Sequence, residues 1–219
     1  MADVSKKLAR TLDMVEEGVY FIINRPRQYG KTTTLYTLVD LLTATGEYIV
    51  FNMSFEGIGN TMFENEEAFA KGFARLLGQM VEESAFSYKD WYDTESKGVN
   101  NLERLSDFIT KLTKKIPQKL VLLIDEVDQS SNNQLFVLFL AMLRNKYLQR
   151  SRFKTFHSVV LAGLHDVKTL KLKLRPDEEQ KLNSPWNIAA TFKVDMHKFA
   201  DTSTNNGNQI QTHTSKTKW

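Results

Sequence analysis

The sequence predicts an α/β fold in which helices cover both faces of a mainly parallel sheet of five strands. Two segments of strand length, 19–24 and 119–124, are almost entirely apolar, and each ends abruptly at polar residues. Unbroken apolar strands are typical of parallel sheets that are buried on both faces. Segments with helical periodicity separate the predicted strands, and this alternation indicates parallel strands joined by helical crossovers.

The strand over 19–24 leads into a loop that ends in Gly30-Lys31-Thr32 and then enters a helix. In such a loop, backbone N–H groups and the positive end of the helix dipole face phosphate oxygens. Lys31 would contact the β and γ phosphates, and the Thr32 hydroxyl would coordinate Mg²⁺. The predicted nucleotide contacts are Arg27, Gln28, Tyr29, Gly30, Lys31, Thr32 and Thr33.

This phosphate loop departs from the general pattern, because Arg25 occupies the position of the first glycine. Gly30 remains where the backbone must approach phosphate most closely. On the tripeptide alone, an ordinary helix that starts after a turn explains the residues equally well. A second motif is needed to decide.

That second motif is the strand over 119–124, which ends in Asp125-Glu126. Asp125 would hold Mg²⁺ through water, and Glu126 would orient and deprotonate the water that attacks the γ phosphate. The simpler reading of the motif is a core strand followed by a solvated acidic turn. Both motifs together, each at a strand's carboxyl end, favour a nucleotide site with Lys31 and Glu126 as its catalytic residues.

With these motifs, the segments 17–21, 161–167 and 183–189 resemble the bacterial AAA-like ATPases of the P-loop superfamily, over about residues 5–196. In that family, arginine regularly takes the place of the first loop glycine, as Arg25 does here. The resemblance implies a three-layer P-loop NTPase fold with the strand order 5-1-4-3-2. It also implies ATP and Mg²⁺ as the ligands.

Helical periodicity and apolar runs define the remaining elements. The first helix covers 5–17, with an apolar face formed by Leu8, Leu12 and Val15. The later elements are helices over 31–45, 66–85, 102–115 and 132–148, and strands over 47–53, 158–162 and 188–194. Gly46 is a favoured helix terminator. The segment 90–98 is polar and is predicted to be a loop.

Composition indicates one soluble domain. The 219 residues are 42% hydrophobic and 25% charged, which is ordinary for a globular protein with a sizeable core. Without cysteines, thiolate metal sites and disulfides are excluded, and the four histidines are scattered. No apolar run has the roughly 18 residues of a membrane span, and no signal peptide is evident, so a cytoplasmic protein without membrane contact is expected.

The predicted domain covers 1–196, and a polar tail over 197–219 is expected to be disordered. The resemblance places a helical lid after the sheet, whereas this tail lacks helical periodicity. A lid normally covers adenine and excludes water. Weak nucleotide affinity and slow turnover are therefore expected.

Secondary site candidates carry less weight. Asn52 and Ser54 end the second strand, where a polar residue can restrain the catalytic glutamate, although a solvated strand end is the simpler explanation. His165 and Asp166 follow the fourth strand, where an ordinary turn explains them. Arg175 lies where a ring-forming ATPase presents an arginine to its neighbour, and a solvated arginine fits equally well.

Two basic clusters and a net charge of +3 do not by themselves indicate nucleic acid, so both clusters are interpreted as solvated faces. The first comprises Arg144, Lys146, Arg150, Arg152 and Lys154, and the second comprises Lys168, Lys171, Lys173 and Arg175.

Three functions remain open. The first is ATP hydrolysis that drives a change in a partner protein or homo-oligomer. The second is a nucleotide-dependent switch with little hydrolysis, and the third is a small-molecule kinase, which the adjacent Asp125-Glu126 pair disfavours.

Overall fold

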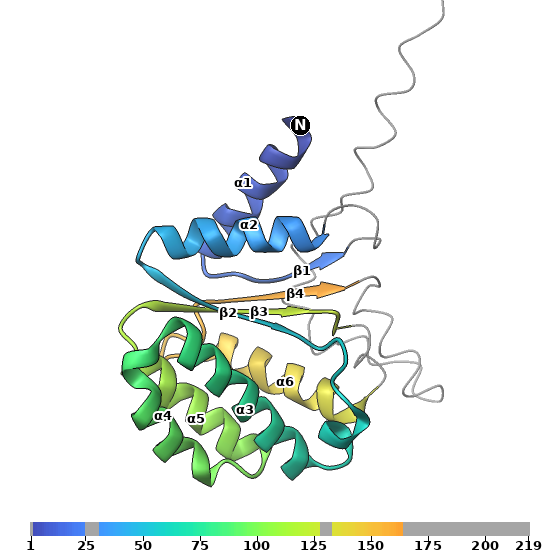
Figure 1. The fold of residues 1–219 in the computed structure, drawn as a ribbon, viewed down its shortest axis with the longest axis vertical. Helices are drawn as coiled ribbons and strands as arrows, with labels where there is room; N and C mark the ends of the chain where they lie inside the picture. Colours follow the sequence, from blue (N-terminus) through green and yellow to red (C-terminus); the bar gives the residue numbers. More distant parts are fainter. Residues whose placement is uncertain (1, 25–30, 128–132, 164–219) are drawn as a thin grey trace, which may run out of the picture.

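A computed structural model describes residues 2–24, 31–127 and 133–163, which form three layers with a sheet in the middle (Figure 1). All strand pairs are parallel, and the sheet order is β1-β4-β3-β2. The strands are β1 (Tyr20–Asn24), β2 (Tyr48–Ser54), β3 (Lys119–Asp125) and β4 (Ser158–Gly163). The sequence-based prediction of parallel strands separated by helices is confirmed for this part of the chain.

The described sheet has four strands, whereas five in the order 5-1-4-3-2 were expected. The difference is the fifth strand, because the segment 188–194 lies outside the described residues. The neighbours β1, β4, β3 and β2 have the expected adjacency.

Helices α1 (Ala2–Glu16) and α2 (Lys31–Ala44) cover one face of the sheet (Figure 1). Alternate strand residues face them, because successive side chains of a strand point to opposite faces. Val15 and the partly buried Leu8 and Leu12 belong to the cluster on this side, which confirms the predicted apolar face of the first helix. The strand residues of this cluster are Phe21, Ile23, Tyr48, Val50, Val121, Leu123, Val160 and Ala162.

The opposite face is covered by α3 (Glu66–Ser84), α4 (Lys89–Glu95), α5 (Leu102–Lys115) and α6 (Gln134–Leu148) (Figure 1). Three short 3-10 turns connect elements of this layer: η1 (Asn60–Phe63), η2 (Phe86–Tyr88) and η3 (Ser96–Gly98). The strand residues of alternate parity pack here, among them the fully buried Leu122 and Ile124. Both faces of the sheet are thus buried, which explains the unbroken apolar strands.

Aromatic side chains join α3 and α6 over the sheet. The ring centroids of Phe73 and Phe139 are 4.4 Å apart, and those of Phe69 and Phe139 are 5.4 Å apart. Phe136 meets Phe55, beyond the end of β2, edge-on at 5.6 Å. Tilted and edge-on contacts at these distances are favourable beyond the area that they bury. The apolar stripe of 66–85 is therefore core.

Asparagine side chains cap the amino ends of α3 and α5. The Oδ1 atom of Asn65 accepts a hydrogen bond from the Ala68 N–H at 2.9 Å, and Asn101 caps α5 through the Arg104 N–H at 2.8 Å. Each cap satisfies an N–H group that the first turn of a helix leaves unpaired. These caps fix where the helices start relative to the strand ends.

The prediction of a loop over 90–98 was wrong, because this segment forms most of α4 and then η3. Tyr92 is buried, and its hydroxyl donates to the Ala74 carbonyl of α3. The ring of Trp91 stacks on Phe108 of α5 at 6.3 Å. The helix is only two turns long, so contacts with α3 and α5 stabilise it rather than its own pattern.

The interpretation of Lys146 as a solvated residue was also wrong. Its side chain is 8% exposed in the α5–α6 contact, and Nζ donates to the Thr110 hydroxyl at 2.6 Å. Burial lowers the pKa of Lys146 to about 8, and the charge of Asp107 opposes this shift only in part.

None of the helices within the described ranges has the length and apolar character needed to cross a bilayer.

The buried lysine gives the stability of the fold a defined pH dependence. In the unfolded chain, a lysine side chain has a pKa of about 10.4. Below pH 8, the folded protein therefore keeps the Lys146 ammonium group charged while it is buried, which is unfavourable. We expect Lys146→Met to raise the free energy of unfolding by about 1–2 kcal/mol near neutral pH. The gain should shrink as the pH rises from 8 towards about 10.4, where the unfolded lysine also loses its proton.

Urea unfolding of the parent and the variant across this pH range measures the effect. Lys111→Met is the matched control, because that lysine is exposed and pairs with Glu95 at 2.8 Å. A gain that stayed constant with pH would contradict the titration of Lys146.

Candidate functional site

The candidate site lies at the carboxyl edge of the sheet, to which all four strand arrows point (Figure 1). The strand ends meet there in register, with Asn24 opposite Gly163 and Ser54 opposite Asp125. The chain passes from β1 to β2 across the α2 face and returns through β3 to β4 across the other face. In open α/β sheets, ligands bind at the carboxyl ends of strands where the connections change face.

Helix α2 begins at this same edge. Its first residue, Lys31, follows the end of β1 after six residues that lie outside the described chain, and α2 then runs back towards the start of β2 (Figure 1). The unpaired N–H groups of the first turn and the positive end of the helix dipole are therefore at the carboxyl edge.

Several of the predicted nucleotide contacts lie outside the described residues, namely Arg27, Gln28, Tyr29 and Gly30. Arg25 also lies outside them. The structure describes the backbone of Lys31, Thr32 and Thr33 within α2, but not their side chains.

Asp125 is the last residue of β3 and is half-buried. It continues the alternation of Val121 and Leu123, so its side chain points to the face that α2 covers. Its Oδ1 atom accepts the Glu126 N–H at 2.7 Å, and its carbonyl accepts the Phe55 N–H at 3.0 Å. These two hydrogen bonds fix both the carboxylate and the backbone at the end of the strand.

The carboxylate of Asp125 and the first turn of α2 thus share one edge and one face of the sheet. β3 and β1 flank β4, so the ends of these two strands are separated by two strand spacings, roughly 10 Å. Mg²⁺ is usually bound by one or two carboxylates together with phosphates and water. A single carboxylate beside a helix start fits that type of site. The described residues contain no group of three or more metal-ligating side chains.

Glu126 has a left-handed backbone, with φ at 54°. This conformation costs a residue other than glycine about 1–2 kcal/mol. Val127 follows and is buried in the core on the opposite side of the sheet from α2. The strain arises because the chain must leave the strand and return to the core within two residues, with Glu126 held half-buried at the edge between them.

Residues 4–215 match a protein-family model described as an AAA-like domain. The chain belongs to the AAA-like family. No curated protein matches it. Family membership indicates a nucleotide-binding, ATPase-like function, and it agrees with the resemblance seen over residues 5–196. The match extends past residue 196, where the domain boundary was predicted.

In this AAA-like chain, Asn52 and Ser54 share the α2 face with Asp125, and Ser54 is its direct partner in the β2–β3 register. Ser54 is exposed, and its hydroxyl oxygen accepts the Glu56 N–H at 3.0 Å. The structure therefore places Asn52 and Ser54 on the same face of the sheet as Asp125. The Ser54 hydroxyl already takes part in a local turn, because it accepts the Glu56 N–H. His165, Asp166 and Arg175 lie outside the described residues.

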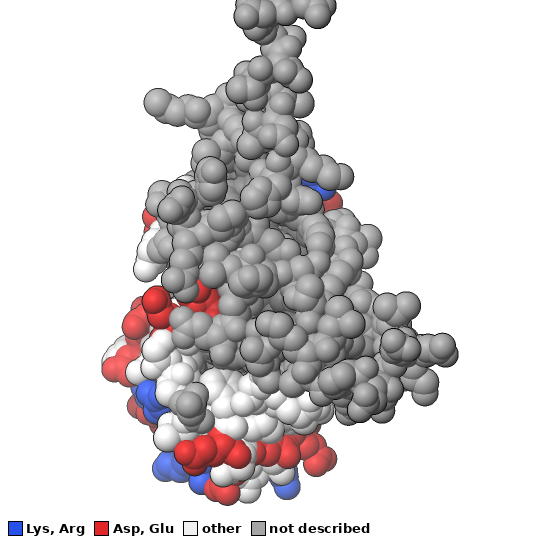
Figure 2. Space-filling view, turned by 90° about the vertical axis from the view of Figure 1, so that its right-hand side faces the viewer, with Lys and Arg blue, Asp and Glu red and all other residues white. Residues whose placement is uncertain are grey.

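Viewed from this edge, acidic side chains are more prominent than basic ones among the described residues (Figure 2).

Sequence reasoning missed one property of the AAA-like site, which is the strained backbone of Glu126. No signal for it exists in the sequence, because glutamate carries no preference for positive φ.

The strain at Glu126 can be measured with two substitutions. Glycine adopts positive φ without penalty, whereas alanine keeps the strain and removes the same carboxylate. We expect Glu126→Gly to be more stable than Glu126→Ala by about 1 kcal/mol, after allowing for the greater freedom of glycine in the unfolded chain. Equal stability of the two variants in urea unfolding would show that the left-handed conformation is not maintained.

Proposed function

We propose that this chain binds ATP with Mg²⁺ at the carboxyl edge of the sheet and hydrolyses it to ADP and phosphate. The observation that carries the proposal is the position of Asp125 and Glu126, which lie at the same sheet edge as the start of α2. In this assignment, hydrolysis drives a conformational change in a partner protein or in an assembly of several copies.

The phosphate loop and the first turn of α2 bind the triphosphate in this proposal. Backbone N–H groups of residues 27–33 and the Lys31 ammonium neutralise phosphate charge. The hydroxyl of Thr32, and the carboxylate of Asp125 through water, would hold Mg²⁺, which would supply positive charge against the phosphates. The Asp125 carboxylate is suited to this role because the Glu126 N–H already fixes its orientation at 2.7 Å.

Glu126 orients and deprotonates the attacking water. A base must be held within hydrogen-bond reach of the proton that it removes. The buried Val127 on one side and the hydrogen bond to Asp125 on the other restrict the backbone at Glu126. The strained conformation supports a functional role, since such outliers cluster at active sites and switch regions.

The same strain also supports an alternative, a nucleotide-dependent switch that hydrolyses ATP slowly or not at all. Relief of the left-handed conformation of Glu126 when nucleotide binds would move the adjacent Val127, which is buried in the core. The two functions share the binding site and differ in the fate of the γ phosphate.

The decisive experiment compares two variants by titration with a fluorescent ATP analogue and by phosphate release. We expect Lys31→Ala to weaken ATP binding about 10- to 100-fold, because it removes a charge-assisted contact. We expect Glu126→Gln to retain binding and to slow phosphate release by about 10²–10⁴. Lys71→Ala and Glu67→Gln are matched controls from an exposed ion pair on α3.

Three results would change the assignment. Phosphate release by Glu126→Gln at the parent rate would show that Glu126 is not the base. ATP binding without release by the parent would establish the switch instead. Transfer of phosphate to a third molecule would indicate a kinase.

A further inference from the structure

A pocket lies at the amino edge of the sheet, opposite the edge that carries the candidate nucleotide site. It has a volume of about 320 Å³ and is bordered by the segments that precede β1, β3 and β4. The polar side chains that line it include those of Glu17, Gln118, Lys119, Arg150, Lys154 and Thr155, so one carboxylate stands among three cations. This volume is at the lower end of the range for small-ligand pockets.

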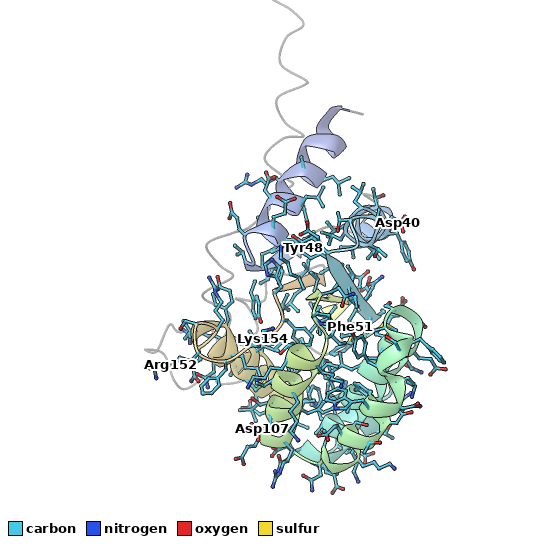
Figure 3. All side chains as sticks on the ribbon, turned by 90° about the vertical axis from the view of Figure 1, so that its left-hand side faces the viewer. Asp40, Tyr48, Phe51, Asp107, Arg152 and Lys154 are labelled. Carbon is cyan, nitrogen blue, oxygen red and sulfur yellow. The ribbon has the colours of Figure 1, made fainter. Side chains whose placement is uncertain are left out.

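The loop from α6 to β4 makes this edge basic. Arg150, Arg152 and Lys154 are exposed, and no carboxylate in the described ranges forms an ion pair with them. Figure 3 views this edge, with Arg152 and Lys154 at the end of α6. Lys119 adds a cation that Glu47 pairs at 3.2 Å.

The loop holds its charged residues in place. The N–H groups of Arg152 and Phe153 donate to the Gln149 carbonyl at 2.9 Å and 3.0 Å. The Arg150 guanidinium lies 3.7 Å from the centre of the Tyr147 ring. These contacts order the loop backbone and the Arg150 side chain, which therefore lose little conformational entropy when a ligand binds.

One feature of this surface suits nucleobases. Phe153 is 50% exposed and stands in the sequence between Arg152 and Lys154, as in proteins that stack bases beside phosphate-binding cations.

We propose that this surface, formed by Arg150, Arg152, Phe153 and Lys154 with the adjoining pocket, binds single-stranded nucleic acid. The cations contact phosphates, and a base stacks on Phe153. An acidic polypeptide is the other polyanion with the right charge. It fits less well because carboxylate side chains have no ring face to stack on the exposed Phe153.

Fluorescence anisotropy with a labelled deoxycytidine oligomer and a labelled thymidine oligomer tests the proposal without ATP, so its outcome is separate from that of the ATPase proposal. We expect the double variant Arg152→Glu/Lys154→Glu to weaken binding at least about tenfold and to lower the salt dependence. Phe153→Ser should weaken binding with the salt dependence unchanged. The parent should bind both oligomers, because stacking on an aromatic ring tolerates any base.

The matched control is Arg75→Glu/Lys97→Glu, which reverses two exposed charges in a separate pocket between α3 and α4. This control should bind as the parent does, and circular dichroism should show that every variant is folded. Absence of binding by the parent, or equal loss in both double variants, would overturn the proposal. Equally tight binding of poly-glutamate that is insensitive to Phe153→Ser would overturn it in favour of an acidic protein partner.

Discussion

The parallel pairing of β3 between β2 and β4 is the constraint on which the rest of the structure depends. β3 is buried on both faces, with Leu122 and Leu123 fully inaccessible on opposite sides. Strands that run in the same direction can be joined only by connections that cross back over the sheet, and right-handed crossovers decide which face each connection covers. This arrangement brings Asp125 and the start of α2 to one edge and the α6–β4 loop to the other.

Two features of the structure oppose its stability. Glu126 is held in a left-handed conformation, and Lys146 places an ammonium group in the contact between two helices. Both are tolerated because the surrounding core is large and because each polar group has a defined partner: the Glu126 N–H has Asp125, and the Lys146 Nζ has Thr110. Their difference lies in position, since only Glu126 stands at the edge where the strand ends meet.

Opposite edges of one sheet present different chemistry. At the carboxyl edge, a fixed carboxylate lies beside the positive end of a helix, which suits a metal-bound phosphate. At the amino edge, Arg150, Arg152 and Lys154 form a basic surface whose cations have no ion-pair partner among the described residues, although Glu17 lines the same pocket. β3 connects the two directly, because it begins at Lys119 beside the basic pocket and ends at Asp125.

The sequence by itself determined the parallel α/β architecture, the start of α2 and the acidic end of β3, because these depend on periodicity and on residues adjacent in the chain. Only the tertiary structure decided that 89–95 is helical, since Tyr92 gains its stability from α3 and α5. It also decided that Lys146 is buried and that Glu126 adopts positive φ. These outcomes arise from contacts between distant segments, and local patterns carry no record of such contacts.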